Sequence, residues 1–118
     1  MLETPDPIRQ SPPLTPAVFY ILFALAEGEK HGYAIMKEVE TVSHGQFTMG
    51  PGTLYTTIQR LLQVAFIEET STSSDSERRR RYYRLSRRGR HVFEAELNRM
   101  ESLVRSAQRR KLVPRDLR

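Results

Sequence analysis

Apolar residues recur at helical spacing in four segments of the chain, which predicts four helices. The first begins at Thr15-Pro16, because threonine is a good N-cap and proline is well tolerated at the first helical position, and it runs to Gly28. It is apolar on two sides, so we expect it to pack against the core of its own domain and against a second subunit. The two stripes are Val18, Ile21, Leu22 and Leu25, and Phe19, Phe23 and Ala26.

The second predicted helix covers residues 31–45 and ends at Gly45. Its buried side is supplied by Ile35, Val39 and Val42. His31 and His44 flank this helix, but no cysteine or further histidine stands at metal-ligand spacing. We therefore expect capping or surface roles for both histidines, and no metal site.

The third predicted helix begins at Gly50-Pro51 and has one apolar and one polar face. The core-facing residues are Leu54, Ile58, Leu61, Leu62 and Ala65. The opposite face holds Thr53, Thr56, Gln59, Arg60 and Gln63, with Tyr55 at the boundary. This face carries no acid, whereas an ordinary exposed helix usually pairs glutamate with lysine. It suits the DNA major groove, where arginine reads guanine and glutamine reads adenine.

Residues 66–71 and 80–86 predict two strands around a polar loop. In the second strand, Tyr83 and Leu85 share one side, while Tyr82 and Arg84 share the other. Three helices followed by a basic hairpin is the order of a winged helix, in which the hairpin touches the flanking DNA backbone. The predicted fold class is therefore mainly α (α+β), a winged helix-turn-helix with a two-stranded basic wing.

A fourth helix of about 25 residues is predicted from its N-cap Ser86 toward Pro114. Its apolar residues recur at alternating steps of four and three, as in a coiled-coil seam. The seam consists of Phe93, Leu97, Met100, Val104 and Ala107. Because this helix is longer than one small domain can cover, we expect the seam to pack on another chain. Packing back on the first helix is the alternative.

The length of 118 residues fits one domain with attached segments. The proline-rich residues 1–13 are interpreted as a flexible N-terminal arm. Residues 14–86 would form the winged helix-turn-helix domain, residues 87–112 a dimerisation helix, and residues 113–118 a tail.

Positive charge is concentrated in one part of the chain. The 19 lysines and arginines outnumber 14 acids, and eight arginines with no acid lie between Arg78 and Arg90. Such a patch attracts polyanions, and arginine suits bidentate contact with phosphate or guanine. A solvated charged face is the alternative, but the interleaved Tyr82, Tyr83 and Leu85 favour an ordered strand that displays the charge.

Several classes of protein are disfavoured. The chain has no cysteine, and hence no disulfide and no thiolate metal site. It has no apolar run of membrane-spanning length and no signal-peptide pattern, so we expect a cytoplasmic protein without a membrane partner. It also lacks a phosphate-cradling glycine loop and a carboxylate–histidine constellation, so we expect no enzyme and no cofactor.

Three motifs resemble the PadR-like family of bacterial transcriptional regulators, particularly its short subfamily with a single C-terminal helix. "FALAEGEKHGYAIMKEVE" is similar to the family's small-Glu-Gly-x-x-His-Gly-Tyr-x-Ile stretch. "GPGTLYTTIQRL" resembles its Pro-Gly-Thr-Leu-Tyr recognition helix, and "RRRRYYRLSRRGR" resembles its Tyr-Tyr-x-Leu-Thr-x-x-Gly wing. Together the motifs cover roughly residues 14–93.

The resemblance implies a homodimeric winged-helix repressor that binds double-stranded DNA and dimerises through its C-terminal helices. Implied DNA-binding residues are Thr53, Tyr55, Thr56, Gln59, Arg60 and Gln63 on the third helix, and Arg78, Arg79, Arg80, Arg81 and Tyr82 on the wing. Expected dimer-interface residues are Phe19, Phe23, Phe93, Leu97, Met100, Val104 and Ala107.

The sequence departs from the family pattern in two places. Thr56-Thr57-Ile58 replaces the usual Pro-x-Leu, and Ala65 replaces a glycine that tolerates positive φ, at a cost of about 1 kcal/mol if that geometry persists. Some relatives bind planar drugs between aromatic residues that include tryptophan. This chain has no tryptophan, which disfavours a drug pocket of that kind.

The leading hypothesis is a repressor that acts as a homodimer on a pseudo-palindromic operator, with release by a small-molecule effector of unknown identity as an open possibility. The alternative is a protein-interaction module that uses the long helix and the basic face without specific DNA binding. RNA binding is disfavoured, because no aromatic stacking sheet is predicted.

Overall fold

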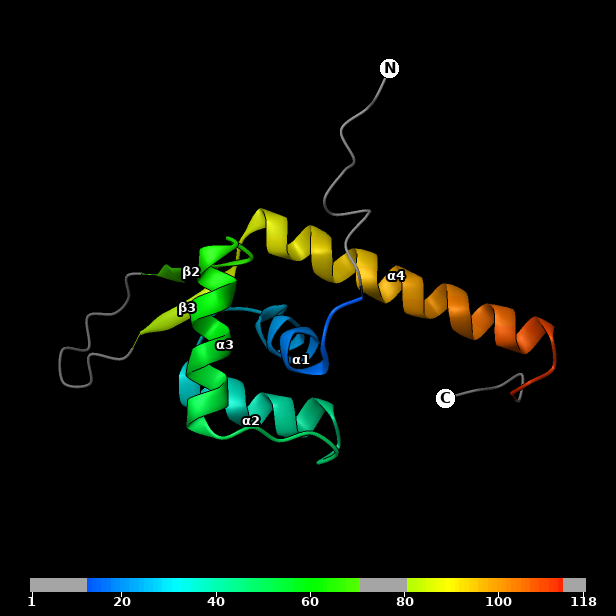
Figure 1. The fold of residues 1–118 in the computed structure, drawn as a ribbon, viewed down its shortest axis with the longest axis horizontal. Helices are drawn as coiled ribbons and strands as arrows, with labels where there is room; N and C mark the ends of the chain where they lie inside the picture. The colour runs from blue at the N-terminus through cyan, green and yellow to red at the C-terminus, as the bar shows by residue number, and fades with distance from the viewer. Residues whose placement is uncertain (1–12, 71–80, 114–118) are drawn as a thin grey trace, which may run out of the picture.

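The computed structural model describes residues 13–70 and 81–113 of the chain (Figure 1). The described residues form four helices and three strands. In chain order these are α1 (Pro16–Leu25), β1 (Lys30–His31), α2 (Gly32–Val42), α3 (Pro51–Gln63), β2 (Ile67–Thr70), β3 (Tyr82–Leu85) and α4 (Arg87–Arg109). The four predicted helices and the predicted hairpin are confirmed, whereas the proposed arm up to residue 12 lies outside the described residues.

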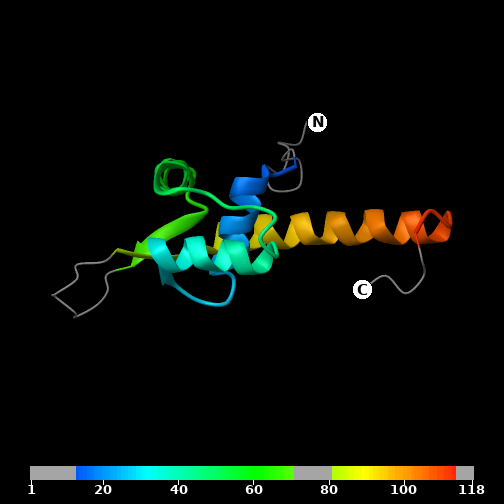
Figure 2. The same cartoon turned by 90° about the horizontal axis from the view of Figure 1, so that it is seen from below.

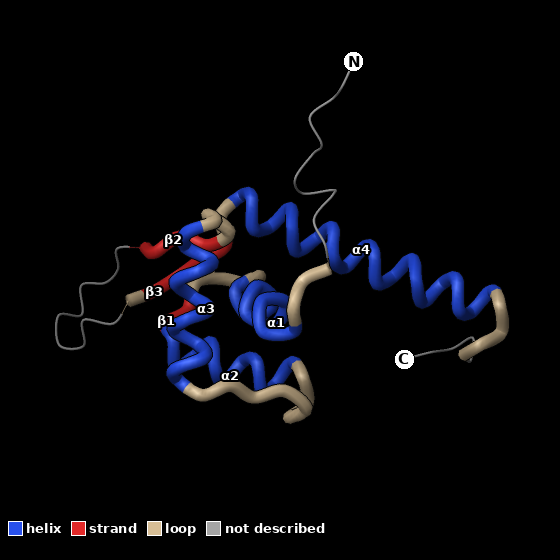
Figure 3. Tube along the Cα trace, viewed as in Figure 1, coloured by secondary structure: helices blue, strands red, loops and turns tan. Residues whose placement is uncertain are grey.

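The strands form a small antiparallel sheet in the order β1-β3-β2 (Figure 3). Strand β3 is central, and it pairs Lys30 with Tyr83 on one side and Glu69 with Tyr83 on the other. The sequence predicted two strands and missed β1. Two residues are too few to show an alternating pattern, and only pairing with β3 makes them a strand.

Helix α1 lies at the centre of the domain, with α2, α3, α4 and the sheet around it (Figure 1). Its residues Ile21, Leu22 and Leu25 are at most 1% exposed. The predicted second apolar side of α1 is only partly covered, since Phe23 is 37% exposed. This central position explains why α1 is apolar on two sides.

Both ends of α2 are capped by residues that the sequence had placed near them. The Nδ1 atom of His31 accepts a hydrogen bond from the Ala34 N–H at 3.2 Å, so the predicted capping role of His31 is confirmed. The helix ends at Val42, three residues before the predicted end. Gly45, with φ of 75°, then donates its N–H to the Glu40 carbonyl at 2.8 Å, which closes the C-terminus.

Ala65 lies beyond the end of α3 with a left-handed φ of 64°. Its prediction as a core-facing helical residue is wrong, because the helix ends at Gln63 and Ala65 is exposed. The positive φ that glycine would tolerate is retained at this position, although the residue is alanine. The Phe66 N–H donates to the Leu61 carbonyl at 2.9 Å, so residue 65 occupies the helix-ending position that glycine usually takes.

We expect Ala65→Gly to stabilise the protein. Glycine removes the left-handed strain of an alanine, and part of this gain is lost because glycine makes the unfolded chain more flexible. The net increase in the free energy of unfolding should be about 0.5–1 kcal/mol, measured by urea denaturation. An unchanged or lower midpoint would show that Ala65 is not strained in solution.

Ser86 joins the start of α4 to the end of α3. Its hydroxyl donates to the Ala65 carbonyl at 2.6 Å and accepts from the Gly89 N–H at 2.9 Å. Its own N–H donates to the Phe66 carbonyl at 3.1 Å. Gly89 faces that same carbonyl, and a Cβ added to Gly89 would lie only 1.9 Å from its oxygen. The Ser-x-x-Gly part of the third motif therefore fixes the corner between α3, β2 and α4.

The second half of α4 extends away from the domain (Figure 2). The buried residues of this helix are Gly89, Val92, Phe93 and Glu96, and none of its described residues after Glu96 is buried. Arg99 pairs with the buried Glu96 carboxylate, with Nε 3.2 Å from Oε1. The alternative, in which the seam packs back on α1, therefore holds at Phe93 but not along the second half of the helix. Among the described residues, no helix is both long and apolar enough to cross a membrane.

Candidate nucleic-acid interface

Helix α3 buries one face and presents the opposite face to solvent. Leu54, Ile58 and Leu61 are at most 2% exposed and hold the helix on the core. The outward residues are all exposed: Thr53, Thr56, Gln59, Arg60 and Gln63. The predicted division of α3 into a core face and a polar face is thus confirmed, apart from Ala65 and the half-buried Leu62.

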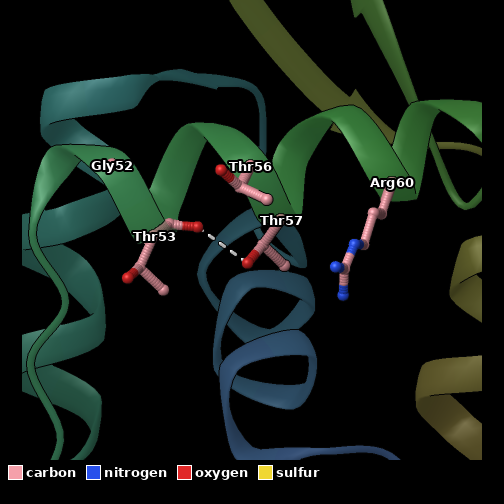
Figure 4. A pocket seen from close by; sticks show the side chains of 5 residues that line it. All are labelled: Gly52, Thr53, Thr56, Thr57 and Arg60. Carbon is pink, nitrogen blue, oxygen red and sulfur yellow. Dashed lines mark hydrogen bonds between the residues drawn. The ribbon is translucent and has the colours of Figure 1, made fainter.

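The outward face of α3 contains an open hollow of about 470 Å³ (Figure 4). It is lined by Gly52, Thr53, Thr56, Thr57 and Arg60. The Thr57 hydroxyl donates to the Thr53 carbonyl at 2.8 Å, so it is already engaged by the helix itself. Arg60 forms no ion pair within the described part of the chain, which leaves its guanidinium available to a ligand.

Gly52 and Thr57 were missed among the predicted site residues. Thr53, Thr57 and Arg60 are spaced four and three residues apart, so they share one side of the helix. That spacing was a usable signal, because the predicted polar face already included Thr53 and Arg60 but not Thr57, which lies between them on the same side.

The turn that leads into α3 is fixed by the buried Ser43. Its hydroxyl accepts from the Phe47 N–H and donates to the Phe47 carbonyl, both at 3.0 Å. The Phe47 ring stacks on Tyr20 of α1, with ring centroids 5.3 Å apart. These contacts set the direction from which the chain enters α3, and so they fix the position of its outward face.

Tyr55 has a packing role in addition to its predicted place at the interface. Its side chain is 46% exposed, yet its hydroxyl end lies against the backbone of Gly32, at the start of α2. A Cβ added to Gly32 would lie 2.1 Å from the Tyr55 hydroxyl oxygen. The glycine of the first motif and the tyrosine of the second are therefore in contact, and together they hold α3 against α2.

The wing strand β3 shows the predicted alternation. Tyr83 and Leu85 point inward, at 2% and 9% exposure, while Arg84 points to solvent. Tyr82 is half-buried and packs edge-on against His31, with ring centroids 5.4 Å apart. Arg81 is exposed, whereas the predicted site residues Arg78, Arg79 and Arg80 lie outside the described residues.

The wing is less positive than the arginine run had indicated. Strand β2 places Glu68 and Glu69 beside β3, where Arg84 Nε lies 3.0 Å from Glu68 Oε1 and Arg81 Nε lies 3.6 Å from Glu69 Oε2. The prediction counted no acid between residues 78 and 90, but it did not count the acids of the neighbouring strand. Burial raises the pKa of the Tyr83 hydroxyl, and the Glu69 carboxylate raises it further.

The predicted dimer-interface residues fall into two groups. Phe93 is only 5% exposed and packs on Phe19 and Phe23, with centroids 5.7 and 5.5 Å away, so it belongs to the core of its own chain. The prediction that Phe93 belongs to an exposed seam is wrong, because α1 still covers α4 at the position where the seam begins. The others retain exposed area: Phe19, Phe23, Leu97, Met100, Val104 and Ala107.

Residues 21–95, more than half of the chain, match the model of the transcriptional regulator PadR-like family. The chain belongs to the PadR-like family of transcriptional regulators. The resemblance carried by the three motifs is thereby confirmed. No curated protein matches the sequence significantly.

Solved structures share the fold of this PadR-like protein. A PadR family transcription regulator from Clostridium difficile has a TM-score of 0.67 and 22% identity over 80% of this chain and 97% of its own. A transcriptional regulator from Clostridium thermocellum has a TM-score of 0.64 and 24% identity, over 79% of this chain and 87% of its own. Bacillus subtilis PadR, solved in complex with operator DNA, has a TM-score of 0.64 and 21% identity, over 73% of this chain and 48% of its own.

At these identities the solved structures establish the fold, which is the predicted winged helix. In this PadR-like chain, α3 is the helix that follows the helix-turn-helix corner, and β2 and β3 form the wing. Within the described residues, no group of three or more histidine, aspartate or glutamate side chains is placed to hold a metal ion.

Proposed function

We propose that this protein is a sequence-specific DNA-binding transcriptional regulator, acting as a homodimeric repressor. The observation that carries the proposal is the outward face of α3, which combines threonine and glutamine side chains with Arg60 and contains no acid. Arg60 forms no ion pair with any other residue that the structure describes. Arginine and glutamine are the side chains that read guanine and adenine in the major groove. Bacillus subtilis PadR, which has the same fold, was solved in complex with operator DNA, and this supports DNA binding as the function.

The wing would contact the sugar-phosphate backbone beside the groove. The proposed contacts are Arg78, Arg79, Arg80, Arg81 and Tyr82. Phosphate contacts of this kind supply affinity and register, while base contacts from α3 supply sequence choice. Residues 14–86 would thus act as the DNA-binding domain.

Helix α4 would form the dimer interface. Its second half carries an apolar seam that no other described part of the chain covers, with Leu97 and Val104 each 37% exposed. At about 1.5 Å per residue, its 23 residues span about 35 Å, which is long enough to pair with a second copy. A two-fold dimer would present two α3 helices to a pseudo-palindromic operator.

Release of the DNA by a small molecule is an optional part of the proposal. An apolar effector would have to use the partly exposed Phe19 and Phe23, since the chain has no tryptophan. Both rings also contact Phe93 of the same chain, which supports a packing role more directly.

The proposal is tested by titrating the DNA upstream of the protein's own gene, and a scrambled fragment, over a salt series. Specific binding is expected, with a log K against log salt slope of about −0.9 for each phosphate neutralised. If a selection from random sequences also gave no preferred site, specific DNA binding would be rejected. A stable complex with another protein would then favour the alternative, a protein-interaction module.

Arg60→Ala is expected to relax base preference at one operator position, at a cost of about 1–3 kcal/mol on the operator and little cost on random DNA. Arg80→Ala, in the wing, is the matched comparison, because it removes the same charge from a proposed phosphate contact. It should weaken binding to both DNAs about equally. Equal losses for the two variants on both DNAs would contradict the assignment of base reading to Arg60.

A further inference from the structure

Four polar groups lie together where the wing meets the recognition helix. Tyr83 is 2% exposed, and its hydroxyl interacts with Glu69, Arg81 and Tyr55, in addition to being desolvated by burial. Arg81 lies 3.6 Å from the Glu69 carboxylate, and its positive charge acts to lower the pKa of the Tyr83 hydroxyl. Tyr55 belongs to α3, so this group joins the wing to the helix proposed to read DNA.

The two arginine–glutamate pairs of the wing lie on opposite faces of the sheet. Side chains alternate along a strand, and the register places Glu69 opposite Tyr83 and Glu68 opposite Arg84. Glu69 and Arg81 therefore share the face of the buried Tyr83, toward α3. Glu68 and Arg84 point the other way, although they are joined by the shorter contact of 3.0 Å.

We propose that Glu69 competes with DNA phosphate for Arg81, and thereby lowers the affinity of the wing for DNA of any sequence. This inference rests on the proposed DNA-binding function. In the free protein Glu69 neutralises Arg81, and on DNA the guanidinium turns to a phosphate, which accepts the same N–H donors. The carboxylate is left close to the DNA anion, where it opposes binding.

The contacts of this pair suit an exchange of partners. Both side chains are well exposed, at 67% for Arg81 and 42% for Glu69, so the pair is weak and open to a ligand. Arg81 also interacts electrostatically with the Tyr83 hydroxyl, and this interaction does not depend on Glu69.

The test compares Glu69→Gln with Glu68→Gln, which removes the same charge from the other face of the same strand. The probes are a duplex selected from random sequence with the wild-type protein, and an unselected duplex, each titrated from about 50 to 200 mM salt. Glu69→Gln should bind both duplexes roughly two- to five-fold more tightly, the range expected for loss of one exposed ion pair. Its slope of log K against log salt should become steeper by up to about 0.9. In the wild type, the Glu69 carboxylate that Arg81 leaves on binding DNA takes up a cation, and the glutamine variant has no such carboxylate.

Glu68→Gln should change binding by less than Glu69→Gln and leave the slope nearly unchanged. In an Arg81→Gln background, the effect of Glu69→Gln should fall to that of Glu68→Gln, since the competing group is gone. Equal effects of the two glutamine variants, or an effect of Glu69→Gln that persists without Arg81, would overturn the inference and leave the proposed function intact. A wild-type protein that binds neither duplex would instead overturn the proposed function, and the inference with it.

Discussion

Gly89→Ala is expected to lower the free energy of unfolding by about 2–4 kcal/mol, the largest stability loss that we predict for a single methyl group in this protein. The added Cβ would lie 1.9 Å from the Phe66 carbonyl oxygen and 2.8 Å from its carbon, which are backbone atoms and cannot rotate away. Either α4 moves off the corner, or the end of α3 moves with Phe66. Both movements strain the hydrogen bonds that Ser86 makes to this corner.

The measurement is urea denaturation monitored by circular dichroism, and alanine variants of two other glycines are the controls. Gly52 lies in α3 with no atom within 4 Å of an added Cβ, so Gly52→Ala should be neutral or stabilising by up to about 1 kcal/mol. Gly32→Ala should be intermediate, because the methyl group meets the Tyr55 hydroxyl at the end of a half-exposed side chain that can swing outward. Similar results for all three variants would show that Gly89 is not closely packed in solution.

The contrast between these glycines and the helices shows which features the sequence could predict. The helices, the two faces of α3 and the alternation of β3 follow from the spacing of apolar residues, because each is set within one element. The glycines were visible as parts of motifs. What each glycine approaches was not, since Phe66 lies 23 positions before Gly89 and Tyr55 lies 23 positions after Gly32. Close backbone approaches are made by tertiary packing, which no local pattern records.

The errors at the candidate site have a similar cause. The arginine run was interpreted along the chain, but Glu68 and Glu69 reach it across the sheet. Phe93 continues the seam of α4 in sequence, but the seam does not show where the helix leaves its own domain. That boundary, close to Glu96, depends on the position of α1. Strand β1 exists only because β3 lies beside it.

Val104→Glu is expected to convert the proposed dimer to a monomer at micromolar concentration and to weaken operator binding by at least about 100-fold. Val104 is 37% exposed and lies beyond the last buried residue of α4, so the substitution should leave the fold of the chain intact. In a two-fold dimer it would place a carboxylate in each copy of the apolar seam, without a partner for either charge. Loss of the second subunit removes the avidity of two linked half-site contacts, which is worth about 10²–10⁴ in affinity.

Ser102→Glu is the matched control, because it adds the same charge to the same stretch of α4, on the side away from the seam. The mass of each variant is measured by sedimentation, and operator and half-site binding are measured in parallel. Val104→Glu should lose the preference for a full site over a half-site, whereas Ser102→Glu should keep it.

If Val104→Glu stays dimeric, the dimer uses another surface, and the exposed seam of α4 needs a different partner. If Val104→Glu is monomeric but still prefers the full site, the two half-sites are bound by copies that do not associate through α4. The overhanging half of the helix would then have no part in recognising the operator.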